Sequence, residues 1–305
     1  MHLFKPSYRL ALLPEAGKDK WSGRPFCLLA CQFLVAWCFT ASLLAQGNAD
    51  WHRPFAAFRI AGNLYYVGTA DLAAYLVHTP QGNILINSDY VQDVPLVRSS
   101  IEKLGFPYRD TKILLISHAH GDHDEGVGVI RRETGAKLMV MEGDVAEVES
   151  TAPGRPGAHV DRVLRDGDLV ELGGTRLTAH LTPGHTKGCT TWTLQVHDGA
   201  HTLNAVIVGS PNVNPGYYLV GNQGYPQIAQ DYVKTFAVLK SLPCDLFLGA
   251  HGAYFGLQAK YAKMQAGGAN PFIDPQGYQA YVAERESAFR TEWERQQKNP
   301  GSPKQ

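Results

Sequence analysis

HAHGDH, from His118 to His123, is the stretch that organises this sequence, because it places three histidines and one carboxylate within six residues. It directly follows the apolar run KILLIS, residues 112–117, which is typical of a buried strand. Two later histidines also stand at the ends of apolar segments, His185 in TPGH and His251 in LGAH. We therefore expect three strand ends to deliver these side chains to one edge of the fold.

The chemistry of this histidine pattern is that of a zinc site. In an irregular turn, His118 and His120 can point the same way, and imidazoles at that spacing bind one zinc ion. We expect His185 to complete this first site, and we expect Asp122, His123 and His251 to hold a second zinc ion. Three protein ligands leave each ion an open position, as in catalytic sites. Two such ions could share a hydroxide, with a pKa of about 7 for the parent water, and Asp122 would also orient it.

The overall composition is that of a soluble globular protein, with 44% hydrophobic and 18% charged residues among 305. Lys and Arg number 28, as do Asp and Glu, so no basic surplus indicates binding to nucleic acid or to an anionic membrane. Cys189 and Cys244 are the two cysteines outside the N-terminal apolar stretch, and they lack CxxC spacing. A thiolate zinc site is therefore not expected, and whether the two form a disulfide stays open.

Residues 1–45 have the order of a secretory signal peptide. Basic residues occur up to Arg24, about 20 apolar residues follow from Phe26, and small residues stand near Ala45 and Ala49. We predict cleavage near one of these alanines, export to an oxidising compartment such as a bacterial periplasm, and no stable membrane association afterwards. The alternative is an uncleaved anchor, because about 20 apolar residues can span a bilayer. Residues 46–305 would form a single catalytic domain.

The remaining sequence alternates between short strands and helices in two halves, without a repeat of about 30 residues. This order favours two sheets packed face to face with helices outside. Expected strands cover 55–62, 64–69, 73–79, 83–88, 112–117, 136–140, two or three within 160–182, 189–197, 201–209 and 244–251. Expected helices cover 94–104, 124–134, 145–150, 225–242, 258–265 and 275–295.

HAHGDH, TPGHT at 182–186 and GAH at 249–251, in this order, resemble the metallo-β-lactamase superfamily. The resemblance extends from about Trp51 to the last predicted helix. It implies an α/β fold, the αβ/βα four-layer sandwich, with two mixed sheets and a dinuclear metal site at one edge. The superfamily also includes glyoxalase II, lactonases and RNA-processing nucleases, so the fold alone does not identify the substrate.

Ser210 distinguishes among these enzymes, because it follows the strand NAVIVG at 204–209. Glyoxalase II and the lactonases have a metal-bridging Asp at the corresponding place, and the first lactamase subclass has a zinc-binding Cys. With neither residue present, the chain resembles the third subclass, B3. The strings TAHLTPGHTKGCTTW at 178–192 and NPGYYLVGNQGYPQIAQDY at 214–232 are also similar to that subclass.

Some positions depart from the subclass pattern. Serines that help to hold the substrate carboxylate often follow position 210, whereas Pro211 and Val213 stand in this region here. Asn212 and Asn214 could replace them as donors. The loop Thr151–His159 is shorter than in many members, which would open the cleft.

Two further departures concern the scaffold. Tyr278 stands where some members have a cysteine that pairs with the one at Cys244, so that disulfide is expected to be absent. Asn87 replaces an Asp that much of the superfamily has at a strand end.

The resemblance implies a secreted, monomeric dizinc hydrolase that opens the β-lactam ring of penicillins, cephalosporins and carbapenems and so gives antibiotic resistance. We expect Ser210 to support a ligand imidazole, and Trp51, Tyr217 and Asn212 are candidate substrate contacts. Another secreted hydrolase of the same fold, a lactonase or an esterase, is the main alternative, although the missing Asp opposes it. A non-catalytic zinc-binding or nucleic-acid-processing module is opposed by the six-ligand set and by the neutral charge.

Overall fold

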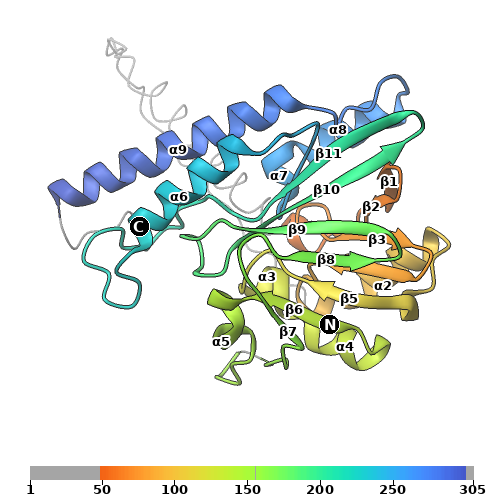
Figure 1. The fold of residues 1–305 in the computed structure, drawn as a ribbon, viewed down its shortest axis with the longest axis horizontal. Coiled ribbons are helices and arrows are strands. Elements are labelled where there is room, and N and C mark those ends of the chain that lie inside the picture. The colour runs from red at the N-terminus through yellow and green to blue at the C-terminus, as the bar shows by residue number, and fades with distance from the viewer. Residues whose placement is uncertain (1–48, 155, 300–305) are drawn as a thin grey trace, which may run out of the picture. The chain divides into compact units, whose positions relative to one another are not determined.

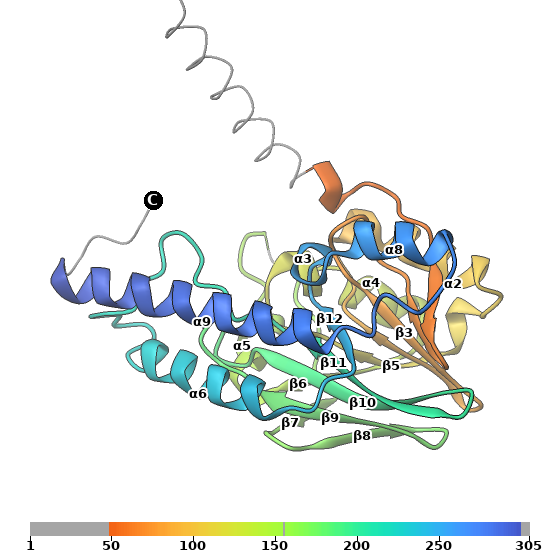
Figure 2. The same cartoon turned by 90° about the horizontal axis from the view of Figure 1, so that it is seen from above.

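Two β-sheets face each other in the computed structural model, which describes residues 49–154 and 156–299 (Figures 1 and 2). These residues all belong to one compact unit, Gln46–Gln305. The predicted leader, residues 1–45, lies outside the described residues. Within the described part of the chain, no helix is long and apolar enough to cross a membrane.

The first sheet has seven strands in sequence order. Its first four strands are antiparallel and joined by short connections: β1 (Phe58–Ala61), β2 (Leu64–Tyr66), β3 (Tyr75–Thr79) and β4 (Gly82–Ile86). Its last three are parallel: β5 (Thr111–Leu115), β6 (Lys137–Met141) and β7 (Arg162–Leu164). The crossovers between parallel strands contain α2 (Val94–Lys103), α3 (Gly121–Asp124), α4 (Val127–Thr134) and α5 (Val145–Val148), with short 3-10 turns at Val91–Asp93, Tyr108–Asp110 and Glu142–Asp144.

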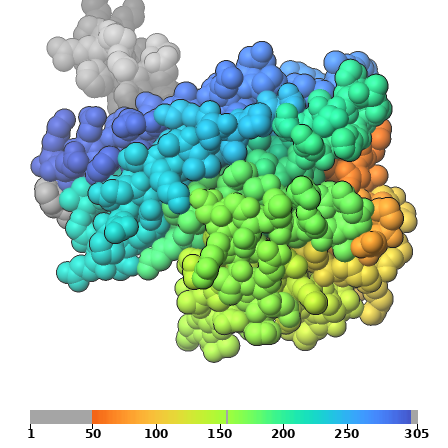
Figure 3. Space-filling model, viewed as in Figure 1, coloured from red at the N-terminus to blue at the C-terminus, as the bar shows by residue number. Residues whose placement is uncertain are grey.

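The second sheet has five strands in the order β12-β11-β10-β9-β8. They are β8 (Leu169–Leu172), β9 (Thr175–Leu181), β10 (Thr190–Asp198), β11 (His201–Val208) and β12 (Leu246–Gly249). The remaining helices are α6 (Ile228–Ser241), α7 (Gly252–Phe255), α8 (Leu257–Gln265) and α9 (Pro275–Lys298). α6 and α9 lie side by side against this sheet (Figures 1 and 2). The hairpin of β8 and β9, coloured green, lies at the surface of the molecule (Figure 3).

Side-chain alternation along the strands produces two layers of core. In β3, Tyr75 and Val77 face the second sheet and pack in the same cluster as Trp192, whereas Leu76 faces α2 and α4. Trp192 is fully buried, and its Nε1 donates to the carbonyl of Ile116 at 3.0 Å. The first sheet is thus covered on both faces, which explains continuous apolar runs such as 84–86 in β4.

The predicted fold class is confirmed, and the differences concern element ends. The helix predicted over 124–134 begins later, as α4 at Val127, and the short helix α3 precedes it. The two are separate because the N–H of Gly126 donates to the carbonyl of Asp89 at 3.0 Å and not to a helix carbonyl. β5 ends at Leu115, before the metal motif, and β12 ends at Gly249. The residues that follow these two strands lie outside the sheet, so their side chains can point towards one another.

Cys189 and Cys244, whose pairing the sequence left open, are both free thiols. Tyr278 stands where a cysteine could have paired with Cys244. It is buried, and its hydroxyl donates to the carbonyl of Leu239 at 2.7 Å.

Candidate metal centre

Three strand ends bring the predicted histidines together. The ligand atoms of His118, His120 and His185 lie within 4.8 Å of one another. Their ring centroids are 4.9 Å apart for His118 and His120, 4.6 Å for His118 and His185, and 4.8 Å for His120 and His185. This arrangement offers three imidazoles to a single metal ion.

A second group adjoins the first. His118, Asp122 and His123 each offer one ligand atom, and these three atoms lie within 4.8 Å of one another. Oδ2 of Asp122 is 3.3 Å from Nε2 of His123 and 3.4 Å from Nε2 of His251. The structure therefore gathers all six predicted ligands into one cluster, with Asp122 between the histidines of the second group.

Backbone positions near the cluster explain how the turns can approach so closely. Gly184 has a φ of +125°, and a Cβ there would lie 2.8 Å from the ring of Tyr232. Asn87 has a φ of 66°, a left-handed conformation that asparagine tolerates. Its Nδ2 donates to the carbonyl of Ala73 at 2.9 Å, and its Oδ1 accepts from the N–H of Ser117 at 2.8 Å. Asn87 thereby fixes the chain just before the histidine motif.

The environment keeps most of these imidazoles neutral, as metal binding requires. Burial lowers the pKa of His123 to about 3 and that of His185 to about 3. Burial also lowers the pKa of His118 well below its usual range, and the neighbouring imidazoles lower it further. For His251, burial acts in the same direction, but hydrogen bonds with Asp122 and Asp71 outweigh it and raise the pKa to about 9.

Asp122 is ionised despite its position. Burial alone would raise its pKa, but the histidines beside it, first His123 and then His251, hold the pKa well below its usual range. The cluster thus combines imidazoles with a carboxylate, which is a donor set that zinc prefers.

In three of the imidazoles the ring nitrogen Nδ1 has a partner. Nδ1 of His118 is 3.2 Å from Oγ of Ser117, and Nδ1 of His185 is 2.8 Å from the carbonyl of Asn212. Nδ1 of His251 is 3.0 Å from Oδ2 of Asp71. Such bonds fix the ring orientation and direct the opposite nitrogen inwards.

His123 provides the test of whether a metal fits this cluster. Its side chain is fully buried, and neither ring nitrogen has a hydrogen-bond partner among the described residues. Unsatisfied polar atoms of this kind are costly in a protein interior. A metal ion bound to one of these nitrogens would satisfy it, so the residues fit the predicted group.

The sequence did not identify Asp71 as part of the site. Besides His251, its carboxylate accepts from the N–H of Ala253 at 2.8 Å and from Nε1 of Trp51 at 3.1 Å. No spacing or motif marks Asp71 among the 28 acidic residues, because its partners are distant in the sequence.

Asp144 is a second residue that the sequence did not identify. Its buried carboxylate accepts from the N–H of Ala119 at 2.9 Å, from Oγ1 of Thr186 at 2.8 Å and from the N–H of Gly188 at 2.7 Å. Ala119 lies within the histidine motif, and Thr186 directly follows His185. Asp144 therefore joins the two loops that carry the first histidine group.

The predicted surroundings of the ligands are placed as follows. Ser210 Oγ lies 3.2 Å from the hydroxyl of Tyr254, whose ring centroid is 5.1 Å from that of His251. Ser210 Oγ also accepts from the N–H of Asn212 at 3.4 Å, so Ser210 contacts the neighbours of the imidazoles and not the imidazoles themselves. Tyr217 donates from its hydroxyl to the carbonyl of His185 at 2.9 Å. The ring centroid of Trp51 lies 5.8 Å from that of His251.

A cleft of about 520 Å³ opens onto this cluster. Trp51, Tyr90, Asn212 and Tyr254 form its walls around His120, Asp122, His185 and His251. No described residue of the loop Thr151–His159 lines it. The cleft is large enough for a small molecule to reach the cluster.

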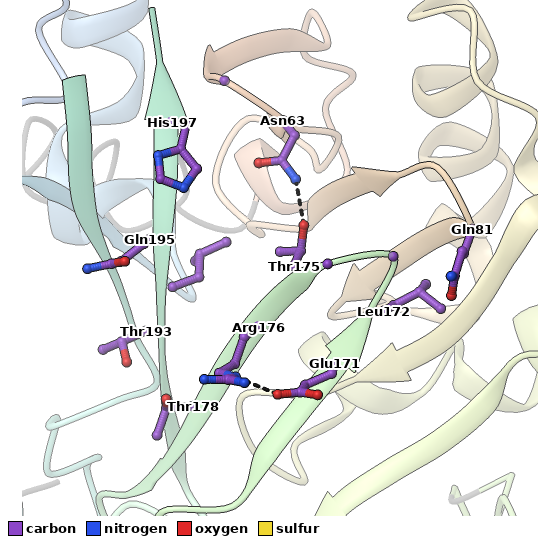
Figure 4. Close-up of a pocket in the computed structure, with 14 residues that line it drawn as sticks. Asn63, Gln81, Glu171, Leu172, Thr175, Arg176, Thr178, Thr193, Gln195 and His197 are labelled. Atoms are coloured by element: carbon purple, nitrogen blue, oxygen red, sulfur yellow. Dashed lines mark hydrogen bonds and ion pairs between the residues drawn. The ribbon is translucent and has the colours of Figure 1, made fainter. Parts of the chain in front are cut away.

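A groove of about 1050 Å³ lies near the hairpin tips of the strands, and it does not offer comparable chemistry (Figure 4). Asn63 donates to Oγ1 of Thr175, and Arg176 pairs with Glu171 across the hairpin of β8 and β9. Because these polar side chains already pair with one another, we assign the reactive site to the histidine cluster.

Comparisons with known proteins agree with this geometry. A family model described as the metallo-beta-lactamase superfamily matches residues 72–251. The solved structure of the native FEZ-1 metallo-beta-lactamase from Legionella gormanii is 52% identical, with a TM-score of 0.79, over 80% of this chain and 98% of that one. BJP-1, a subclass B3 metallo-beta-lactamase of Bradyrhizobium japonicum, is 38% identical, with a TM-score of 0.77, over 81% and 97% of the two chains.

Curated relatives found from the sequence carry other names. Two hydroxyacylglutathione hydrolases of Rhodopseudomonas palustris are 24% identical over 193 residues and 28% identical over 116 residues, which are 63% and 38% of this chain. The human mitochondrial persulfide dioxygenase ETHE1 is 32% identical over 92 residues, 30% of this chain and 32% of its own length. The matches span 66% and 40% of the two hydrolases' own length.

Proposed function

Because this chain belongs to the metallo-beta-lactamase superfamily, we propose that it is a zinc-dependent hydrolase that opens the ring of β-lactam antibiotics. The observation that carries the proposal is the six-ligand cluster combined with Ser210. Ser210 supplies neither the carboxylate nor the thiolate that other branches of the superfamily bring to this position. The similarity to subclass B3 enzymes over about four fifths of the chain supports the same conclusion.

In this proposal His118, His120 and His185 hold one zinc ion, and Asp122, His123 and His251 hold another. When bound, zinc supplies Lewis acidity and makes water nucleophilic near neutral pH. Asp71, the carbonyl of Asn212 and Ser117 keep three of the imidazoles oriented. The carboxylate of Asp122 would accept a hydrogen bond from the attacking water and so orient it. No side chain of the cluster needs to act as the nucleophile.

Residues that line the cleft would position the substrate. Trp51 and Tyr90 present aromatic surface on one side of the cleft, with ring centroids 6.3 Å apart. Asn212 and Asn214 also line the cleft and carry amide groups that can donate to substrate oxygens. Tyr217 holds the His185 backbone and thereby supports the first zinc site.

The second candidate is hydrolysis of a thioester or an ester. It is favoured by the curated relatives named hydroxyacylglutathione hydrolase, which match 193 and 116 residues of this chain. The absence of an Asp at position 210 opposes it, since the resemblance to those enzymes predicts a metal-bridging carboxylate there.

We further propose that the enzyme is exported, acts as a monomer and confers antibiotic resistance where it is produced. Export is predicted from residues 1–45, which lie outside the described residues. N-terminal sequencing of the mature protein checks this part of the proposal. A start near residue 46 or residue 50 is expected, and an intact leader on the active protein would contradict it.

The activity is tested with a penicillin, a cephalosporin and a carbapenem, each with and without a chelator. Turnover that the chelator abolishes and zinc restores is expected. Turnover of S-lactoylglutathione or a homoserine lactone, with no turnover of any β-lactam, would replace the proposal with the second candidate. Metal analysis of His251→Ala tests the ligand set, because that variant should retain one tightly bound zinc ion instead of two.

A further inference from the structure

A long loop, residues 209–227 between β11 and α6, runs beside the first histidine group; the structure describes all of it and gives it no helix or strand. The loop carries Tyr217, whose hydroxyl donates to the carbonyl of His185 at 2.9 Å and lies 3.4 Å from Nε2 of His120. Holding one residue of such a loop in place costs conformational entropy. Contacts from outside the loop must therefore keep Tyr217 at the metal centre.

Gln296, in the last turn of α9, makes such a contact. Its side chain is buried, with 2% exposed. Its Oε1 accepts from the N–H of Leu219 at 2.7 Å, and its Nε2 donates to the carbonyl of Tyr217 at 2.8 Å. The same Nε2 also donates to Oε1 of Glu292, one turn earlier on α9, at 2.8 Å. One side chain thus holds the loop backbone on both sides of residue 218 and is itself held by the helix.

The two bonds to the loop require an amide. The residue at 296 must accept from an N–H and donate to a carbonyl, whereas a carboxylate only accepts, a lysine only donates and a thioether is a weak acceptor. Leu219 is buried and Tyr217 is partly buried, so the loss of these bonds would leave backbone groups without their partners in the interior. A substitution of similar length at this position therefore cannot hold the loop in the same way.

The effect of Gln296 reaches the metal cleft through Tyr217. The N–H of Tyr217 donates to the carbonyl of Asn214, which lines the cleft, at 3.1 Å. The ring centroids of Tyr217 and His185 are 5.9 Å apart. Because the tyrosine ring is rigid, a displaced Tyr217 backbone would carry the hydroxyl away from the His185 carbonyl. No residue of α9 is among the described residues that line the cleft, so the helix acts on it through this loop.

We propose that Gln296 is a positioning residue of the metal centre, which holds the 209–227 loop so that the hydroxyl of Tyr217 stays bonded to the His185 turn. This inference rests on the proposed function, since it requires a zinc ion at the first histidine group. Its consequence is that the last turn of α9, which supplies no metal ligand, determines how tightly that ion is bound.

Gln296→Met tests the role, because it keeps the length of the side chain and removes both bonds to the loop. The matched control is Gln297→Met, which changes the exposed glutamine next to it on the same helix. Stepwise competition with a chromophoric chelator measures the two zinc affinities. We expect Gln296→Met to lower one of them about tenfold, the lower end of the loss that follows removal of a ligand's hydrogen-bond partner, and Gln297→Met to match the wild type. Urea unfolding of the zinc-free variants shows that each is folded.

The Tyr217→Phe background separates positioning from general destabilisation. With the hydroxyl absent, Gln296→Met should cause no further loss of zinc affinity. An equal loss in both backgrounds, or no loss in either, would overturn the role of Gln296. If Gln296→Met does not fold, Gln296→Glu, which keeps the acceptor for Leu219 and loses the donor, takes its place in the same comparison.

The same measurements distinguish this inference from the proposed function. If the wild type binds zinc but hydrolyses no β-lactam, the proposed function fails, and the zinc affinities of the four combinations at positions 217 and 296 still decide the role of Gln296. If the wild type hydrolyses β-lactams and Gln296→Met keeps both zinc affinities, the role of Gln296 fails alone. A wild type that binds no zinc would overturn both.

Discussion

Asp71 accepts a hydrogen bond from Nδ1 of His251 at 3.0 Å, although 180 residues separate the two in the chain. The same carboxylate accepts from the N–H of Ala253 and from the indole of Trp51. It therefore holds three parts of the site: the imidazole, the start of α7 (Gly252–Phe255) and one wall of the cleft. A carboxylate in this position also makes the opposite nitrogen of His251 a better metal ligand.

Replacing Asp71 with Asn should weaken the second metal site without unfolding the protein. The amide keeps the shape of the side chain but loses the charge, so we expect zinc affinity to fall about 10- to 100-fold. Competition with a chromophoric chelator measures this. Asp110→Asn, an exposed change at a residue that pairs with Lys112, serves as the control. Wild-type affinity in Asp71→Asn would show that the bond to His251 does not support the metal.

Asp144 should matter more for stability than Asp71. It accepts three hydrogen bonds from two loops, and its carboxylate is buried. An amide at this position would turn an NH2 group towards at least one of these donors, so Asp144→Asn should lower the free energy of unfolding by about 2 kcal/mol. Urea unfolding of the zinc-free protein measures this loss. The same variant should bind the first zinc ion more weakly, and an unchanged stability would contradict the joining role.

The clustering of the histidines and Asp122 could be predicted from the sequence because these residues lie in short motifs at the ends of apolar strands. The strand periodicity also predicted both sheets, since alternate residues such as Tyr75 and Leu76 belong to different layers of core. Asp71 and Asp144 could not be predicted, because a hydrogen bond between distant segments leaves no spacing in the sequence. The break between α3 and α4 at Gly126 could not be predicted for the same reason, since its N–H donates to the carbonyl of Asp89 in a distant segment.

Asn87 combines a left-handed backbone with two side-chain hydrogen bonds, and two substitutions separate these contributions. Asn87→Gly keeps the backbone conformation and loses the bonds. Asn87→Ala loses the bonds and also strains the backbone, so it should be less stable than the glycine variant by about 1 kcal/mol. Chemical denaturation of both variants checks the order. Equal stabilities would mean that the backbone conformation at residue 87 relaxes at no cost.

Asp161 gives a pH dependence of stability that is independent of the metal. Burial alone would raise the pKa of its carboxyl, but a hydrogen bond from the N–H of Leu138 and the guanidinium of Arg131 outweigh this and lower the pKa. The native state therefore binds this proton less tightly than the unfolded chain does. The resulting stabilisation is present above the unfolded pKa of about 3.9, and it is lost as the pH falls through the lower folded value.

Asp161→Asn removes this titration while the amide oxygen can still accept from Leu138. The variant should be less stable than the wild type at pH 6, and the difference in free energy of unfolding should shrink at pH 3 and below, because protonation then removes the charge from the wild type too. Urea unfolding in the presence of a chelator measures both proteins without a contribution from metal release. Arg131→Gln should show the same trend, since it removes the partner charge. A difference that stays constant from pH 6 to pH 2 would show that the Asp161 charge does not stabilise the fold.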